Sequence, residues 1–193
     1  MLEKKINDLK NYIKDLKKVS IGFSGGKDSL FLILISIRAI GNNNVLPVFI
    51  DLEYIDDDIR KRVDYFYKKY ELNLIKSDID INNNFDILNN TEMRCYWCKR
   101  LIYEKIRKIS FKYSIKNICD GSNYSDMSKH RPGLKALKEL NIIKPLAKFK
   151  IIDNEIYDYL KNIENIDEKH LTSTTCNLVK LPHNTPWKQY EKF

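Results

Sequence analysis

The sequence predicts an α/β fold, a parallel sheet that carries helices on both faces. Short apolar runs alternate with segments of helical spacing, and several runs end at glycine or aspartate. Strands that alternate with helices build parallel sheets, because each connection between parallel strands needs a crossover. The chain has 193 residues, of which 43% are hydrophobic, and this suffices for one domain with a sizeable core.

The elements can be assigned in order along the chain. Apolar residues every three or four positions predict an N-terminal helix with one apolar face, formed by Leu2, Ile6, Leu9, Ile13 and Leu16. Strands are predicted at 19–23, 45–50, 74–76, 117–120 and 142–145. Further helices are predicted at 29–40, from Asp56 or Asp57 to Tyr70, and at 97–112, 132–140 and 153–160, the last capped by Asp153. Residues 81–92 are predicted to be a loop, residues 1–165 one domain, and residues 166–193 an irregular tail.

Composition limits the classes of function. No apolar run approaches the roughly 20 residues that span a bilayer. The N-terminus mixes charged and aliphatic residues and lacks the apolar core of a secretion signal. We therefore expect a cytoplasmic protein with no membrane partner. The net charge of +8 suits a polyanion or a phosphorylated substrate, but lysine is spread along the whole chain, which favours a merely lysine-rich surface.

The stretch FSGGKDS, residues 23–29, indicates a phosphate-binding loop. It is not the common nucleotide loop, because Gly22 and Gly26 are separated by three residues where that motif has four. A predicted strand leads into the glycines and a predicted helix follows, so the N–H groups of the first helical turn would face an anion. Ser24 and Ser29 add hydroxyl donors and Lys27 adds a cation.

Asp28 is the unexpected member of this loop. A carboxylate beside a phosphate is repulsive unless a cation lies between them, so Asp28 indicates Mg²⁺. The simpler interpretation is a strand-to-helix turn capped by serine. Gly25 and Gly26 allow the backbone to approach a ligand closely, and the full six-residue string favours the phosphate site over this simpler interpretation.

This string resembles the S-G-G-x-D-S loop of the N-type ATP pyrophosphatases, also called PP-loop enzymes. The resemblance implies an adenine nucleotide alpha hydrolase-like fold with ATP bound by Ser24, Gly25, Gly26, Lys27, Asp28 and Ser29. It implies cleavage of ATP between the α and β phosphates and transfer of AMP to a substrate oxygen. The loop would hold the departing pyrophosphate, and a nitrogen or sulfur nucleophile would then displace AMP.

Two further stretches resemble the LarE family of ATP-dependent sulfur transferases within this superfamily. They are RCYWCKRLIYEKI at 94–106 and DGSNYSDMSKHRPGLKALKELNIIKPL at 120–146, and the likeness covers roughly residues 19–176. The resemblance implies a small-molecule carboxylate or nucleotide-like acceptor and a sulfide or other sulfur donor. One type of member sacrifices its own cysteine, and another carries sulfide on a [4Fe–4S] cluster held by three cysteines.

The four cysteines are Cys95, Cys98, Cys119 and Cys176. The Cys-x-x-Cys spacing of the first two lets both thiolates reach one metal centre, although a pair of buried thiols is the alternative. The resemblance adds Cys176 as the third cluster ligand, which would leave one iron open. Two alternatives remain: zinc with Cys119 as fourth ligand, and a disulfide or persulfide between Cys98 and Cys176. Cys119 itself follows a buried strand and is better explained as a structural thiol.

Residues after the fourth predicted strand complete the expected site. The resemblance implies that Gly121 and Asn123 bind ATP and that Asp126 joins Asp28 at Mg²⁺, although an ordinary Asx turn is the alternative for this stretch. Arg131 is expected to clamp a phosphate or carboxylate. The expected catalytic residues are Asp28, Cys176 and Arg131.

The sequence also departs from the family pattern. Lys27 stands where the family more often has valine, and the serine and arginine expected soon after Cys176 are absent. The chain is shorter than usual members, and we expect a homo-oligomer, in the simplest case a dimer. Two other functions remain open: a tRNA thiolation enzyme of the same superfamily, which is not favoured because no compact RNA-binding module is visible, and a non-catalytic nucleotide-binding partner subunit.

Overall fold

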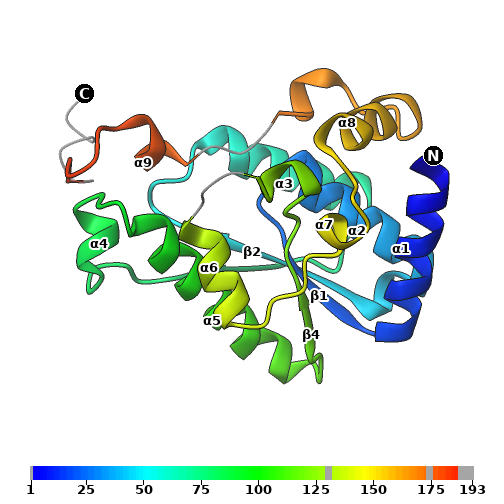
Figure 1. Ribbon diagram of the computed structural model, residues 1–193, viewed down its shortest axis with the longest axis horizontal. Coiled ribbons are helices and arrows are strands. Elements are labelled where there is room, and N and C mark those ends of the chain that lie inside the picture. Colours follow the sequence, from blue (N-terminus) through cyan, green and yellow to red (C-terminus); the bar gives the residue numbers. More distant parts are fainter. Residues whose placement is uncertain (1, 129–131, 173–175, 187–193) are drawn as a thin grey trace.

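The structure of the chain is a computed structural model that describes residues 2–128, 132–172 and 176–186 (Figure 1). These residues form a four-stranded sheet of β1 (Val19–Gly22), β2 (Val45–Asp51), β3 (Ile75–Asp78) and β4 (Asn117–Cys119). The strand order is β3-β2-β1-β4, and every pairing is parallel. The predicted parallel sheet is therefore confirmed.

Helices cover both faces of this sheet, as predicted (Figure 1). One core contains buried residues of α1 (Leu2–Leu16), α2 (Lys27–Ile40), α3 (Asp57–Lys69) and α8 (Asp153–Asn162). The other contains residues of α4 (Phe85–Leu88), α5 (Arg94–Lys112), α6 (Pro132–Glu139) and α9 (Asn177–Lys180). The short elements are η1 (Asn42–Asn44), η2 (Tyr124–Asp126), α7 (Pro145–Lys148) and η3 (Glu168–His170).

Strand β2 shows why the sheet is buried on both sides. Val45 and Phe49 lie in the core of α1, α2, α3 and α8, whereas Leu46, Val48 and Ile50 lie in the core of α5 and α6. Successive side chains of a strand point to opposite faces, so a strand covered on both faces is almost continuously apolar. This accounts for the short unbroken apolar runs that predicted the strands.

Some predicted elements differ from the observed ones. The fifth strand, predicted at 142–145, is wrong: Ile143 makes only an isolated parallel bridge to Cys119, and Pro145 already begins α7. The predicted loop at 81–92 contains α4, where the Asn84 side chain accepts a hydrogen bond from the Ile87 N–H at 3.0 Å. The helix predicted to start at residue 97 starts at Arg94.

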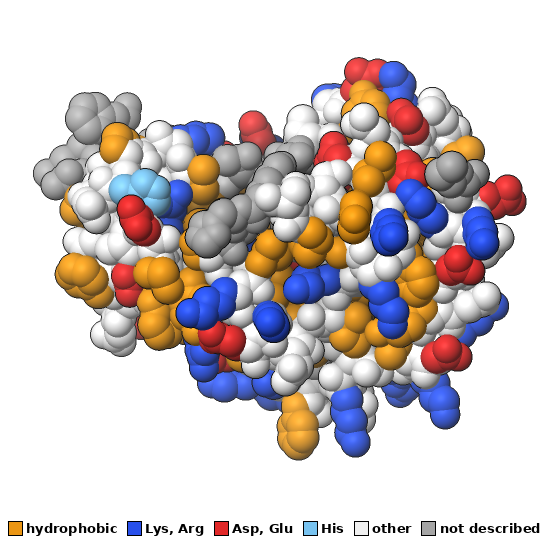
Figure 2. All heavy atoms as spheres, in the orientation of Figure 1, with side chains coloured by type: hydrophobic (Ala, Val, Ile, Leu, Met, Phe, Trp, Pro, Cys, Tyr) orange, Lys and Arg blue, Asp and Glu red, His pale blue; other side chains and the backbone are white. Residues whose placement is uncertain are grey.

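The surface carries no single dominant charge on the face shown in Figure 2, where Lys and Arg side chains are interspersed with Asp and Glu. This distribution follows from lysines spread along the chain. In the part of the chain that the structure describes, no helix combines the length and the apolarity needed to cross a bilayer.

Candidate active site

The strand order places a ligand crevice at the carboxyl ends of β1 and β4. From β1 the chain proceeds to β2 and β3 on one side, and β4 then pairs with the other side of β1. In an open parallel sheet, the point where the strand order reverses leaves a crevice between the loops that follow the strands. Here those loops are residues 23–26 after β1 and residues 120–123 after β4.

Hydrogen bonds within the loop after β1 fix its shape. The Ser24 N–H donates to the Ser29 hydroxyl at 3.2 Å, the Gly26 N–H donates to the Ser24 hydroxyl at 3.3 Å, and the Ser29 hydroxyl donates to the Gly26 carbonyl at 3.0 Å. Gly25 has a φ of 75°, which glycine adopts without steric cost. Gly26 is the N-cap of α2, and because it has no side chain it leaves the first N–H groups of the helix to a ligand.

The loop after β4 packs directly onto the start of α2. A Cβ atom at Gly121 would lie 2.8 Å from the Ser29 Cα and 2.9 Å from its N, so only glycine fits there without movement. Asn123 is buried nearby and forms reciprocal hydrogen bonds with Asp126, at 3.3 Å and 3.2 Å, that cap η2. The structure thus brings Gly121 and Asn123 beside the serines of the first loop. Arg131 lies outside the described residues.

Charged groups crowd around Asp28. Lys27 is only 3% exposed, forms an ion pair with Asp153 and lies 3.5 Å from Asp28 Oδ1. Burial raises the pKa of Asp28; Asp153 and Asp126 add to this, while Lys27 and a hydrogen bond with Asn123 oppose it. Because other carboxylates lie near Asp28, binding of a further cation would favour the ionised form of its carboxyl group.

The sequence interpretation missed Asp153 as a site residue. It predicted a helix cap, but the N-cap of α8 is Ile152, and the Asp153 side chain reaches Lys27 instead. Only the fold joins two residues that lie 126 positions apart.

Asp120 is an ionised anchor at the end of β4. Its carboxylate is 3% exposed and accepts hydrogen bonds from Lys99 Nζ at 2.7 Å, the Tyr103 hydroxyl at 2.6 Å and the Ser122 N–H at 2.7 Å. Burial alone would raise the pKa of Asp120, but Lys99 and the hydrogen bonds outweigh it and lower the pKa to about 2. Lys99 and Tyr103 lie on α5, so this anchor ties α5 to the loop after β4.

Two of the expected cysteines line the same cleft as the loop after β1. The cleft has a volume of about 450 Å³, and its walls include Ser24, Asp28, Ser29, Cys98 and Cys176. Such a volume lies within the range of small-molecule sites. Cys95 lies one helical turn before Cys98 on α5. The structure therefore brings together the phosphate loop and thiols that the sequence places about 70 and 150 residues away.

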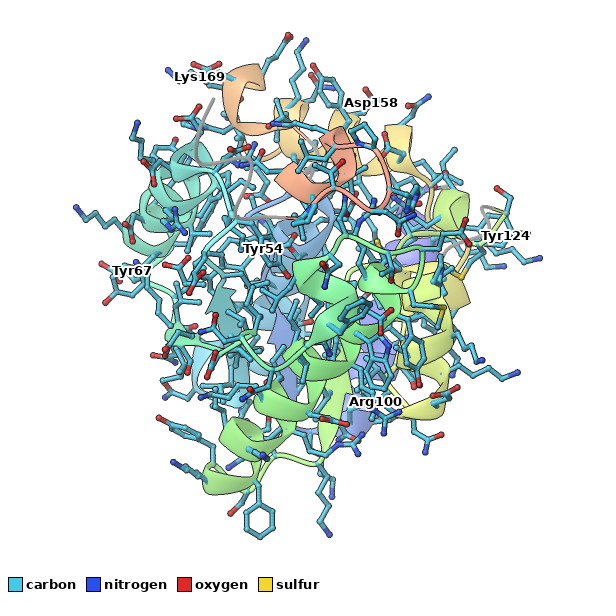
Figure 3. All side chains as sticks on the ribbon, turned by 90° about the vertical axis from the view of Figure 1, so that its left-hand side faces the viewer. Tyr54, Tyr67, Arg100, Tyr124, Asp158 and Lys169 are labelled. Atoms are coloured by element: carbon cyan, nitrogen blue, oxygen red, sulfur yellow. The ribbon has the colours of Figure 1, made fainter. Side chains whose placement is uncertain are left out.

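The thiols in this cleft are held in their neutral form. The Tyr54 hydroxyl, near the middle of the view in Figure 3, lies 3.1 Å from Cys98 Sγ. Burial raises the pKa of Cys98. Burial also raises the pKa of Cys176, to about 12, and the nearby thiols of Cys98 and Cys95 add a smaller effect. Cys119 is fully buried in the core beneath α2, as its interpretation as a structural thiol requires.

The thiol set suits iron chemically, because thiolates are the usual ligands of iron–sulfur clusters. Within residues 2–128, 132–172 and 176–186, no three His, Cys, Asp or Glu side chains are grouped so as to hold a metal ion. The cysteines would have to lose their protons on metal binding, and ligand deprotonation generally accompanies it.

No protein-family model matches the chain. It is 37% identical over 185 residues to the uncharacterized protein MJ0830 of Methanocaldococcus jannaschii, covering 94% of this chain and 69% of that protein. It is 28% identical over 127 residues to the pyridinium-3,5-bisthiocarboxylic acid mononucleotide synthase of Lactiplantibacillus plantarum, covering 66% and 46%. Its fold is similar to that of the U34-tRNA thiolase NcsA from Methanococcus maripaludis with its [4Fe-4S] cluster (TM-score 0.60, 20% identity, 84% of this chain and 65% of that one).

Proposed function

Because the chain belongs to the LarE-like family of the PP-loop ATP pyrophosphatases, we propose that it is an ATP-dependent sulfurtransferase. It would activate a substrate oxygen as an adenylate and replace that oxygen with sulfur. The observation that supports this best is the shared cleft, in which the phosphate loop faces Cys98 and Cys176. A loop without thiols would favour adenylation alone, and thiols without the loop would favour redox chemistry.

The loop after β1 supports the first half-reaction. An oxygen of the acceptor carboxylate attacks the α-phosphorus of ATP, the bond from that phosphorus to the oxygen of the β-phosphate breaks, and pyrophosphate leaves. The N–H groups of the first turn of α2, the hydroxyls of Ser24 and Ser29, and Lys27 would stabilise the negative charge on the leaving group. Asp28 and Asp126 would hold Mg²⁺ between themselves and the phosphates.

Several further residues would bind the nucleotide and the acceptor. Gly121 lets the strand-end loop approach Ser29, and Asn123, which lines the same cleft, would contact the nucleotide. We assign Arg131 the clamping of an acceptor carboxylate or phosphate, from its position in the matched R-P-G stretch.

The cysteines support the second half-reaction. A sulfur nucleophile attacks the activated carbon of the acyl-adenylate, and the bond from that carbon to the AMP oxygen breaks. Cys95, Cys98 and Cys176 would hold a [4Fe–4S] cluster, which would supply the sulfur for this attack. Cys98 and Cys176 line the wall of the cleft, and the Tyr54 hydroxyl fixes the position of the Cys98 sulfur. Each thiol gives up its proton when it becomes a ligand.

The first half-reaction can be tested by its products. Protein purified without oxygen is incubated with Mg²⁺, ATP and pyridinium-3,5-dicarboxylic acid mononucleotide, and the nucleotides are separated chromatographically. We expect AMP and pyrophosphate in equal amounts, a loss of both in Asp28→Ala, and no change in Asp15→Ala, whose side chain is exposed on α1. Release of ADP and orthophosphate would contradict the proposal.

A further inference from the structure

A second cavity, of about 630 Å³, lies on the outer side of α3. It is bounded by α3, by η3 and by the end of α9, and Lys169 of η3 is labelled in the upper part of Figure 3, above Tyr54. None of the steps proposed above uses it. Its walls carry the basic side chains Lys61, Arg62, Lys169 and Lys180, and the acidic side chains Asp56 and Asp58.

The cavity therefore carries a net charge of +2, from four basic and two acidic side chains. The exposed pairs are partly neutralised, with Lys61 Nζ 3.4 Å from Asp58 and Lys180 Nζ 3.3 Å from Asp56. His170 adds no full charge at neutral pH, because burial and the neighbouring Lys169 lower its pKa. The positive charge that remains available belongs mainly to Arg62.

Arg62 is a buried cation that forms no ion pair with a carboxylate among the residues that the structure describes. It is 8% exposed, and Ile59, Val63 and Phe66 of the same helix are buried as well. Its Nη1 donates to the Thr172 hydroxyl, while its Nε has no hydrogen-bond partner among the described residues. No carboxylate of the described residues forms an ion pair with it. A buried guanidinium left in this state is unfavourable, and an anion in the cavity would compensate it.

The cavity is joined to the active-site cleft through α3. Ile59 lines both. On the other side of α3, a Cβ atom at Gly25 of the phosphate loop would lie 2.9 Å from Val63 Cγ2 and 3.1 Å from Ile59 Cγ2. Asn177, the residue after Cys176, donates to Asp56 Oδ1 at 2.5 Å, which bonds the wall of the second cavity to the thiol-bearing segment. The second cavity therefore adjoins the helix and the segment that line the active-site cleft.

We infer that this cavity binds the phosphate monoester of the sulfur acceptor, with Arg62 as its central ligand, an inference that rests on the proposed function. A phosphate monoester carries nearly two negative charges at neutral pH, opposite in sign to the net charge of the cavity walls. The guanidinium can bond two of its oxygens at once. An RNA backbone would need an extended basic stripe, whereas the walls of this cavity carry acidic side chains, Asp56 and Asp58, among the basic ones.

The test measures binding rather than turnover. Protein saturated with α,β-methylene ATP and Mg²⁺, so that the ATP site is filled, is titrated calorimetrically with nicotinic acid mononucleotide and with its dephosphorylated nucleoside. We expect the mononucleotide to bind at least tenfold more tightly than the nucleoside. Arg62→Met should weaken it about tenfold to hundredfold, as expected for lost hydrogen bonds between charged groups. Lys169→Ala should weaken it by a smaller factor.

Arg60→Met is the matched control, because Arg60 lies on the same helix, outside the cavity, and pairs with Asp51 and Asp57. It should bind the mononucleotide as the unaltered protein does. Should Arg62→Met fail to fold, the exposed Lys169→Ala decides the outcome. Equal binding by the variants and the unaltered protein overturns the inference, as does binding of a short single-stranded RNA in place of the mononucleotide.

The failure of the proposed function would look different. If Arg62→Met no longer binds the mononucleotide but the unaltered protein makes ADP from ATP, the phosphate site is supported and the adenylating reaction is refuted. If AMP and pyrophosphate form in all variants and no protein binds the mononucleotide more tightly than the nucleoside, the adenylating reaction is supported and the phosphate site is refuted.

Discussion

Replacing Gly121 with alanine tests the packing of the two loops that form the cleft. The added Cβ would lie 2.8 Å from the Ser29 Cα and 2.9 Å from its N, where ordinary contacts begin at 3.4 Å. Both contacts are backbone atoms, so no flexible side chain can swing away. The loop after β4 and the start of α2 must therefore separate by about 0.6 Å, the difference between 3.4 and 2.8 Å.

The displacement should impair function more than stability. Overpacking of this kind costs about 1–3 kcal/mol, which lowers the Tm of a chain of this length by roughly 2–12 °C. The same shift moves the N–H groups and the Ser29 hydroxyl that would bind the phosphates, and sub-ångström errors in such groups reduce rates by roughly tenfold to a hundredfold. Calorimetric titration with α,β-methylene ATP and the rate of pyrophosphate release measure this loss.

Gly41→Ala provides a control of matched stability. Gly41 has a φ of 79°, so alanine is strained there by about 1–3 kcal/mol, yet a Cβ atom would meet nothing within 4 Å. Both variants should melt earlier than the unaltered protein, and only Gly121→Ala should lose nucleotide. If a folded Gly121→Ala protein binds the ATP analogue normally, the packing of this loop on Ser29 does not shape the phosphate site.

Two further changes test the anchor and the thiols. Because the pKa of Asp120 is lowered from 3.8 to about 2, its ionised form should contribute about 2 kcal/mol above pH 4, and this contribution should be lost as the pH falls through 2. In urea unfolding, Asp120→Asn should therefore lose less free energy of unfolding between pH 5 and pH 2 than the unaltered protein does. An equal loss in the two proteins would refute the assignment. After anaerobic reconstitution, Cys119→Ala should keep its iron and sulfide, whereas replacing Cys95, Cys98 or Cys176 with alanine should abolish the binding of both. Zinc as the only metal in all of these proteins would contradict a cluster.

Local patterns predicted most of the fold, and one of them marked the candidate phosphate loop. The strands and helices were predictable because each buried run is short and is followed by a segment of helical spacing. The phosphate loop was predictable because all six of its residues are adjacent in the chain. The strand predicted at 142–145 failed because an apolar run alone does not tell a paired strand from a single bridge ahead of Pro145.

The rest of the site depends on contacts between distant residues. Asp153 predicts only a helix start in the sequence, and its ion pair with Lys27 requires α8 to lie beside α2. Tyr54 carries no motif that sets it apart, yet its hydroxyl reaches Cys98. Lys99 lies in the matched RCYWCK stretch, but nothing in that stretch indicates that it pairs with Asp120. Arg62 falls at the helical spacing of buried residues, three positions after Ile59, and this signal could have marked it as an unusual arginine.

Helix α5 connects the two halves of the proposed reaction. Its first turns carry Cys95 and Cys98, and Lys99 and Tyr103 bind the carboxylate of Asp120 at the end of β4. The next residue, Gly121, rests on the first turn of the phosphate-loop helix. This chain of contacts links the helix that carries two of the thiols to the proposed phosphate site, and the lowered pKa of Asp120 keeps its carboxylate ionised at physiological pH. In the proposed reaction both steps act on the same carboxyl group of the acceptor, the first at its oxygen and the second at its carbon, so ATP and the sulfur must be held close together in one cleft.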